Sequence, residues 1–286
     1  MLLTPRELEI VIDRALEEDS ISADVTTSAL IPSHLQARAS LIPKEPGILS
    51  GLDVVSATFK RVNPDLVFAQ KLVDGDRVQG GEVVAIISGS MASILTAERT
   101  ALNFLQRMSG IATLTDLYVK AVDGTTASIA DTRKTAPGLR LLDKYSVSIG
   151  GGRNHRMNLT DGVLIKDNHL AALSGEGVSL SQAIKRARAK APHTVKIEVE
   201  VETVEAALDA TAAGADIVML DNMSPSEMRN AVDQISAECF VEASGNVTLE
   251  NVAEVAQSGV DIISVGALTH SVRALDISLD YETDSA

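Results

Sequence analysis

The sequence predicts an α/β protein whose larger part is a parallel α/β barrel, closed or nearly closed. From residue 127 onward, short apolar strands alternate with amphipathic helices. Repeated strand–helix units require parallel pairing and helices that cover the sheet. Six such units favour a barrel over a Rossmann sheet. In addition, no GxGxxG motif follows the first of these strands, as a dinucleotide-binding fold would require.

The part before residue 127 is predicted to mix helices and strands. Thr4 and Pro5 are typical of a helix start, so we expect a helix over residues 5–18. Residues 20–32 read as a loop. Asp-Gly and Gly-Gly turns separate several short strands before residue 91. We expect short strands within 37–51 and within 66–95, with a helix between them at 52–62. Residues 92–122 are expected to be helical, with a break into two helices at Ser109-Gly110.

The barrel elements are predicted from six apolar stretches and the periodic segments between them. The strands are expected at 127–131, 162–167, 194–201, 216–222, 239–244 and 261–266, and the helices at 137–149, 179–190, 203–213, 225–237 and 248–257. In the third strand Glu198 and Glu200 alternate with apolar residues, so they share one face. That face either lines the barrel mouth with carboxylates or is a solvated edge.

Composition excludes several classes of protein. The net charge of −14 argues against a nucleic-acid partner, because phosphate backbones need a basic surface. One cysteine, Cys239, excludes an internal disulfide and a CxxC motif. The N-terminus lacks the features of a signal peptide, and no apolar run reaches the roughly 20 residues of a membrane span. We therefore expect a cytoplasmic protein with no membrane partner.

One segment, residues 131–170, departs from this acidic average. It carries seven Arg or Lys residues against four Asp or Glu residues, together with His155 and His169. A solvated charged face would follow the average of the chain. A basic segment in an acidic protein instead suggests a site for a small anion.

The predicted strands end in charged or small polar residues. In α/β barrels the active site lies at these carboxyl ends, so a catalytic site is favoured over ordinary turn chemistry. One half of this site is cationic and would bind carboxylates or phosphates, and the other half is acidic and suits Mg²⁺ or sugar hydroxyls. These residues are Asp131, Arg133, Lys134, His155, Arg156, Lys166, Glu198, Glu200, Asp221, Ser244, Gly245, Ser264 and Gly266. Together they imply a phosphorylated sugar, a metal ion and a second anionic substrate.

Five motifs occur along the chain in this order: ERTALNFLQRMSGIAT, DTRKTAPGLR, GGGRNHRMNLTDGVLIKDNH, LDN and EASGN. With these motifs the chain resembles, over nearly its whole length, the quinolinate phosphoribosyltransferase family, also called carboxylating nicotinate-nucleotide pyrophosphorylases. The resemblance implies an open, TIM-like barrel of the type II phosphoribosyltransferase kind at 111–270. It also implies an N-terminal α+β sandwich domain at 1–110, to which we expect residues 271–286 to return.

The family's reaction joins quinolinate to 5-phosphoribosyl-1-pyrophosphate with Mg²⁺, giving nicotinate mononucleotide, CO₂ and pyrophosphate in NAD biosynthesis. The resemblance also implies a homodimer in which Arg99 reaches the neighbouring site. The implied quinolinate site is Arg99, Thr132, Arg133, Lys134, His155, Arg156 and Lys166. The implied phosphoribosyl pyrophosphate site is Glu200, Asp221, Ser244, Gly245, Asn246, Ser264, Val265, Gly266 and Ala267. Lys134, Lys166, Glu200 and Asp221 would be catalytic, and Glu200 and Asp221 would hold the metal directly or through water and pyrophosphate.

Three alternatives remain open. The first is a paralogue associated with molybdenum transport, which shares the barrel and some motifs. The second is a Schiff-base aldolase that uses Lys166, which lies at a strand end. The third is a regulator that binds a phosphorylated sugar without catalysis. Two positions depart from the family pattern: Ala23 stands where Gly is common, and Asn246 ends the EASGN motif.

Overall fold

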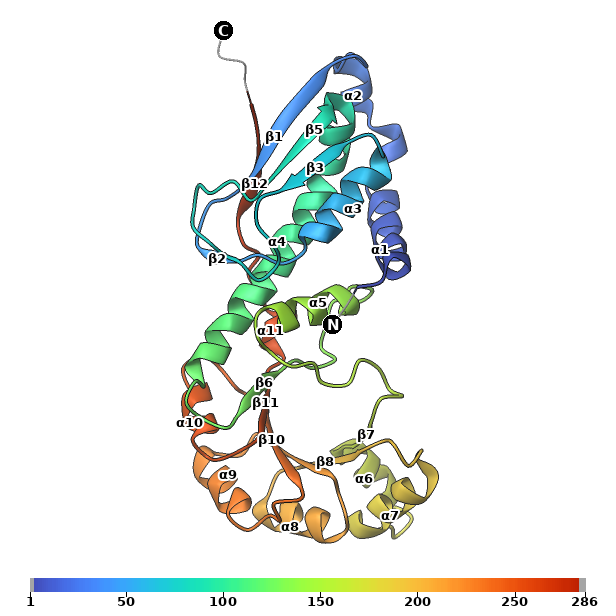
Figure 1. Cartoon of the computed structure of the whole chain (residues 1–286). Coiled ribbons are helices and arrows are strands. Elements are labelled where there is room, and N and C mark those ends of the chain that lie inside the picture. The colour runs from blue at the N-terminus through green and yellow to red at the C-terminus, as the bar shows by residue number, and fades with distance from the viewer. Residues whose placement is uncertain (1–2, 283–286) are drawn as a thin grey trace. The chain divides into compact units, whose positions relative to one another are not determined.

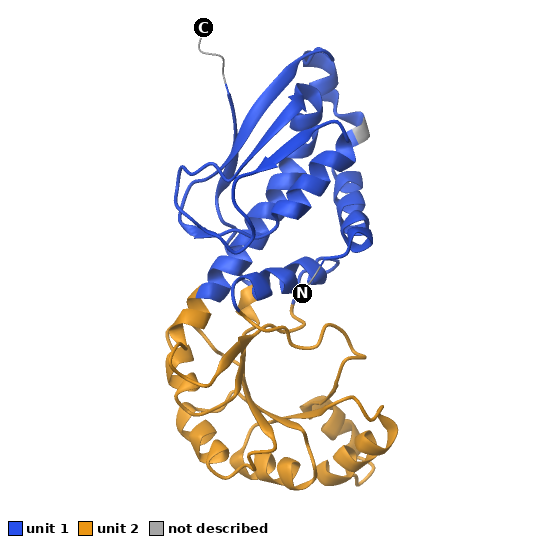
Figure 2. Ribbon diagram, viewed as in Figure 1, with its two compact units in different colours: residues 1–116, 135–151, 269–286 blue, residues 117–134, 152–268 orange. Residues whose placement is uncertain are grey.

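The computed structural model describes residues 3–282, which separate into two compact units (Figure 2). Unit 1 comprises residues 1–116, 135–151 and 269–286, and unit 2 comprises 117–134 and 152–268. The predicted fold class is confirmed, since a parallel sheet in unit 2 accompanies a mixed α and β unit 1.

The first two α-helices of unit 1 are labelled α1 and α2 in Figure 1, and the side chain of the preceding residue caps each of them. The Thr4 side chain accepts a hydrogen bond from the main chain of Glu7, which starts α1 (Pro5–Glu18) at its predicted position. The segment 20–32 was expected to be a loop, and this is wrong: it forms the 3₁₀ helix η1 (Ile21–Ala23) and α2 (Val25–Leu30). Asp24 caps α2 by accepting from Thr27 N at 2.9 Å. Helix α3 (Leu52–Val62) has its predicted bounds.

The strands of unit 1 form a four-stranded antiparallel sheet in the order β12-β1-β5-β3. They are β1 (Gln36–Pro43), β3 (Val67–Gln70), β5 (Ala85–Ser90) and β12 (Ile277–Tyr281). A separate pair joins β2 (Gly47–Ile48) to β4 (Arg77–Val78). The core against this sheet is mainly aliphatic and includes Leu41, Ile87 and Leu105, as a chain with 2% aromatic residues requires.

The long helix α4 (Met91–Ala121) runs through the position of the expected break at Ser109-Gly110, so that prediction is wrong. The small residues serve close packing instead. Ser109 Oγ donates to Ser50 O at 3.3 Å. A Cβ atom on Gly110 would lie 2.3 Å from Arg273 O, so the chain around Arg273 can approach only a glycine.

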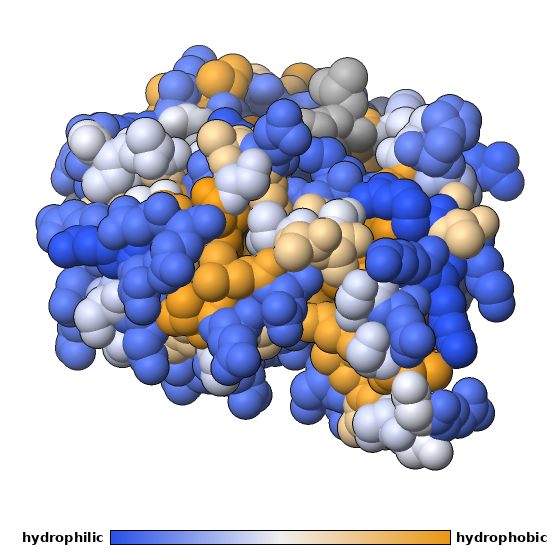
Figure 3. All heavy atoms as spheres, turned by 90° about the horizontal axis from the view of Figure 1, so that it is seen from below, coloured by the Kyte–Doolittle hydropathy of each residue, from blue (hydrophilic) through white to orange (hydrophobic). Residues whose placement is uncertain are grey.

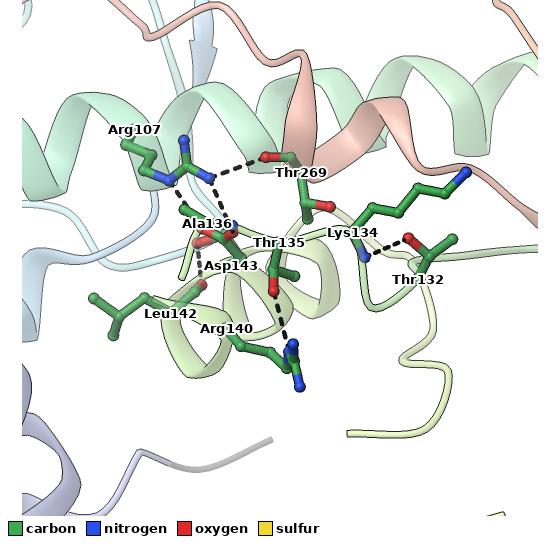
Figure 4. A network of polar contacts seen from close by, with 10 residues as sticks. Arg107, Thr132, Lys134, Thr135, Ala136, Arg140, Leu142, Asp143 and Thr269 are labelled. Atoms are coloured by element: carbon green, nitrogen blue, oxygen red, sulfur yellow. Dashed lines mark hydrogen bonds and ion pairs between the residues drawn. The ribbon is translucent and has the colours of Figure 1, made fainter. Parts of the chain in front are cut away.

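A buried carboxylate ties together three segments of unit 1 (Figure 4). Asp143, on α5 (Arg140–Ile149), has no exposed surface. It accepts from Nε and Nη2 of Arg107, both at 2.9 Å, and from Ala136 N at 3.1 Å. Arg107 Nη2 also donates to Thr269 O at 3.0 Å. These bonds fix the segment that follows the basic motif to α4.

Unit 2, orange in Figure 2, is an open barrel. Its six parallel strands lie in the order β6-β11-β10-β9-β8-β7. The strands are β6 (Ser128–Ala130), β7 (Val163–Ile165), β8 (Ile197–Val201), β9 (Ile217–Asp221), β10 (Phe240–Ser244) and β11 (Ile262–Ser264). The first strand in sequence therefore pairs with the last. Among the described residues no ladder joins β6 to β7, and this gap opens the barrel.

Short helices follow the strands of unit 2. They are α6 (Asp167–Ser174), α7 (Leu180–Lys190), α8 (Val204–Ala212), α9 (Pro225–Val232), α10 (Val252–Ala256) and α11 (Ala267–His270), the last of which extends into unit 1. Helix α6 was not expected, whereas α11 begins directly after Gly266, where a helical stretch was expected. Within residues 3–282, every helix is too short or too polar to cross a bilayer. On the face in Figure 3, hydrophilic residues surround a few apolar patches.

Candidate active site

A cavity of about 570 Å³ lies in unit 2 at the carboxyl ends of the barrel strands. It gathers twelve of the residues that the sequence predicted: Thr132, Arg133, Lys134, His155, Arg156, Lys166, Glu200, Asp221, Ser244, Gly245, Asn246 and Ser264. Four further lining residues were not predicted, namely Leu164, Met219, Asn222 and Glu242. The strand ends therefore meet at one edge of the sheet, as parallel pairing requires.

The cationic side of the cavity is formed by the loops after β6 and before β7. Arg156 Nη1 donates to Gly162 O at 3.1 Å. Burial and the nearby positive charge of Arg133 lower the pKa of Arg156. Thr132 Oγ1 accepts from Lys134 N at 3.0 Å and so shapes the turn (Figure 4). The guanidinium groups of Arg133 and Arg156 are therefore near enough to affect each other's charge, and an anionic ligand would be favoured between them.

The acidic side is formed by β8 and β9. Glu200 pairs with Lys166 across the mouth. Burial and the neighbouring charge of Glu200 raise the pKa of Asp221. Two carboxylates that repel each other in this way would be stabilised by a divalent cation. A Mg²⁺ ion here would complete its shell with water and substrate oxygens, which fits its usual coordination.

The alternation predicted for 194–201 is confirmed, because Glu200 lines the cavity and Glu198 is 4% exposed inside the barrel. Strand β8 is not a solvated edge, since it pairs with β7 and β9.

The loop after β10 has a tight backbone. Gly245 has φ +84°, and a Cβ there would lie 2.3 Å from Asn222 Oδ1. Asn246 also has positive φ, and its side chain donates to Asn222 Oδ1 at 2.9 Å. Asn222 in turn donates to Asp221 Oδ2 at 2.7 Å. The Asn246 side chain is thus turned toward β9 and links the two loops.

Beneath the cationic side lies a cluster of His155 with two buried carboxylates. His155 Nε2 is 3.2 Å from Glu198 Oε2 and 3.6 Å from Glu242 Oε1. Burial lowers the pKa of His155, but Glu198 and Glu242 raise it more, to about 10. Burial has the opposite effect on the carboxylic acid and raises the pKa of Glu198, because it disfavours the charged form. The sequence contained a signal for Glu242, because it lies two residues before Ser244 and so shares its face of β10.

Within residues 3–282, three buried side-chain atoms lack a hydrogen-bond partner, and all three belong to residues that line this cavity. They are Arg133 Nε, Glu242 Oε1 and Ser264 Oγ. Buried polar atoms are normally paired, so unpaired ones gathered in one cavity indicate groups that a ligand satisfies.

The remaining predicted residues lie elsewhere. Val265, Gly266 and Ala267 follow β11, where Val265 is buried and its N–H donates to Ala130 O at 2.9 Å. Arg99 lines a cavity of about 580 Å³ in unit 1, between α1, α4 and the loop before α5. Arg14 and Arg107 line the same cavity.

Family comparisons cover both parts of the chain. The family model described as the C-terminal domain of quinolinate phosphoribosyl transferase matches residues 111–280. The model of the N-terminal domain matches residues 24–109.

Individual relatives match over most of their lengths. The probable nicotinate-nucleotide pyrophosphorylase [carboxylating] of Bacillus subtilis is 42% identical, over 96% of this chain and 93% of that protein. The chloroplastic nicotinate-nucleotide pyrophosphorylase [carboxylating] of Arabidopsis thaliana is 45% identical, over 98% of this chain and 84% of that protein. The crystal structure of NadC from Streptococcus pyogenes superposes with a TM-score of 0.92 at 43% identity, covering 99% of this chain and all of that one.

Proposed function

The chain belongs to the quinolinate phosphoribosyltransferase family, and on this basis we propose that it transfers phosphoribosyl from 5-phosphoribosyl-1-pyrophosphate to quinolinate. The products would be nicotinate mononucleotide, CO₂ and pyrophosphate. One observation carries the proposal: a single cavity joins a cationic wall with an unpaired Arg133 Nε to an acidic wall formed by Glu200 and Asp221.

Quinolinate is a dicarboxylate, which explains the need for several converging cations. Arg133 and Arg156 would receive its carboxylates, because guanidinium groups bind carboxylates in a bidentate manner. Lys134 and Lys166 would add positive charge. In a homodimer, Arg99 of the neighbouring subunit would complete the wall.

The second substrate would lie toward β9, β10 and β11. Glu200 and Asp221 would face the ribose hydroxyls and the Mg²⁺–pyrophosphate group. Ser264 Oγ, which is buried without a partner, and the main chain of Gly245 would bind the 5-phosphate. Mg²⁺, when bound, supplies positive charge that neutralises the pyrophosphate.

The residues of the cavity would act mainly by positioning and by charge stabilisation. The C1–pyrophosphate bond breaks, C1 gains oxocarbenium character, and the pyridine nitrogen attacks it. Glu200 or Asp221 would stabilise the positive ribose. The C2 carboxylate then leaves as CO₂, the quaternised pyridinium ring stabilises the electron pair left on C2, and C2 takes up a proton from solvent water to give nicotinate mononucleotide. We assign no general base.

The test is pyrophosphate release from phosphoribosyl pyrophosphate with Mg²⁺, with quinolinate, with nicotinate or with no acceptor. We expect release with quinolinate only, and loss of release when Mg²⁺ is chelated. Equal release with nicotinate, or release without an acceptor, would contradict the proposal.

A further inference from the structure

His155 lies in a polar layer that replaces part of the usual aliphatic filling of a barrel. The layer draws Asp131 from the end of β6, Glu198 from β8 and Glu242 from β10, which are alternate strands of the sheet. All three carboxylates are at least 96% buried, with exposures of 0%, 4% and 1%. Barrel interiors are built from such layers of alternate strands, normally with branched apolar side chains.

The main chain of His155 is fixed by the first of these acids. Asp131 Oδ1 accepts from His155 N at 2.9 Å, and Asp131 Oδ2 accepts from Asn154 Nδ2 at 2.7 Å. The backbone of this segment is therefore attached to β6.

The imidazole ring is fixed by hydrogen bonds at both nitrogens. Arg156 N–H donates to Nδ1 at 2.7 Å, and Nδ1 can accept only while it carries no proton. Burial lowers the pKa of His155, but Glu198 and Glu242 raise it more and so favour a charged ring. A second proton on Nδ1 would, however, point at the Arg156 N–H, so the geometry leaves a single ring proton, on Nε2. Nε2 faces Glu198 Oε2 at 3.2 Å, and Glu242 Oε1 lies farther away at 3.6 Å. The three side chains also satisfy the spacing of a metal site, but a protonated Nε2 cannot ligate a metal.

Packing alone does not hold this ring. His155 and Glu242 line the cavity at the carboxyl ends of the strands and also a second cavity of about 370 Å³ within unit 2. Open space on two sides leaves the hydrogen bonds to set the orientation of the imidazole.

We propose that Glu198 is a positioning residue that acts through His155. Its carboxylate accepts from Nε2–H, the ring then presents Nδ1 to the main chain of Arg156, and Arg156 is fixed against the cationic wall. The role needs a hydrogen-bond acceptor at position 198, and it does not need a negative charge there. The expected effect on the KM for quinolinate rests on the proposed function, whereas the position of the proton on the His155 ring does not.

The first test is ¹⁵N NMR of the histidines in the resting protein, with His155 assigned from a His155→Gln variant. We expect one neutral form of His155 with the proton on Nε2, in the wild type and in Glu198→Gln. Protonation of both nitrogens, or of Nδ1 alone, would overturn the proposal whatever reaction the enzyme catalyses.

The second test compares Glu198→Gln, which keeps an acceptor oxygen, with Glu198→Leu, which removes it at similar volume. Glu205→Leu, at an exposed position on α8, is the matched control. Loss of one buried partner should raise the KM for quinolinate by about tenfold in Glu198→Leu and by less than about twofold in Glu198→Gln. The KM for phosphoribosyl pyrophosphate should stay near that of the control.

An equal rise in the KM for quinolinate in Glu198→Gln and Glu198→Leu would show that the negative charge, or a cation bound to it, matters, and would refute the proposal. A parallel rise in both KM values would do the same, because it indicates general disruption of the barrel. If Glu198→Leu does not fold, the proposal is still refuted by a rise of more than about twofold in the KM of Glu198→Gln for quinolinate, or by an NMR spectrum with a proton on Nδ1 of His155.

Discussion

Arg133 is the residue on which the substrate assignment depends most. Its Nε is buried and unpaired, beside Arg156 on the cationic wall. Arg133→Ala should lower kcat/KM for quinolinate by about 100-fold, since a charge-assisted pair contributes about 3 kcal/mol. Arg133→Lys should recover part of this, because it restores the charge without the bidentate geometry. Steady-state kinetics of the two variants measure the effect, and near-normal kinetics for Arg133→Ala would refute the assignment.

Sequence reasoning at the residue scale found groups that follow strand ends and missed one inside a strand. Arg133, Lys166 and Asp221 stand out because polar residues after an apolar run are visible in the sequence. Glu242 is flanked by apolar neighbours and precedes Ser244 by one period of the strand. The partners of His155 come from β8 and β10, so its ring orientation depends on contacts that no local pattern specifies.

At the scale of elements, Gly110 shows why a glycine inside a helical pattern was misread as a break. Gly110→Ala places a methyl group against Arg273 O and the Cα of Ala274, at 2.3 and 3.1 Å. We expect it to lower the free energy of unfolding by about 1–3 kcal/mol, as overpacking does. The control is Gly175→Ala, whose nearest atom would be Ala172 O at 3.9 Å and which should change stability by less than about 0.5 kcal/mol.

Urea unfolding of the two variants provides the measurement for Gly110. Wild-type stability in Gly110→Ala would mean that the Arg273 segment can move away at little cost, which contradicts a packing role for the glycine.

Predictions of elements succeeded where apolar periodicity was strong and failed where it was absent. The strands β8 and β9 and the helix α7 lie where the apolar runs indicated. Helix α6 has no buried residue and therefore no apolar face to reveal it. The predicted helix 225–237 ends early, at Val232 in α9, because the following residues form a turn.

At the scale of the whole molecule, the sequence predicted repeated strand–helix units and did not specify how the barrel closes. Pairing of β6 with β11 joins Ser128 to Ile262, far apart in the chain. Such closure depends on the tilt and stagger of all strands together, and no local segment encodes it.

The homodimer that we propose makes a test by complementation possible. If Arg99 acts in the neighbouring subunit, Arg99→Ala and Arg133→Ala should each retain only about 1% of wild-type kcat/KM when assayed alone. After unfolding and refolding together, random pairing should restore about one quarter of wild-type activity, because one site of each mixed dimer is intact. Mixtures no more active than either variant would contradict a shared site.

The central claim is that quinolinate is both the acceptor and the source of CO₂. The most direct measurement uses quinolinate labelled with ¹⁴C in its 2-carboxyl group, together with phosphoribosyl pyrophosphate and Mg²⁺. The account predicts one labelled CO₂ released for each unlabelled nicotinate mononucleotide formed. Label retained in the nucleotide, or pyrophosphate released without labelled CO₂, would contradict it.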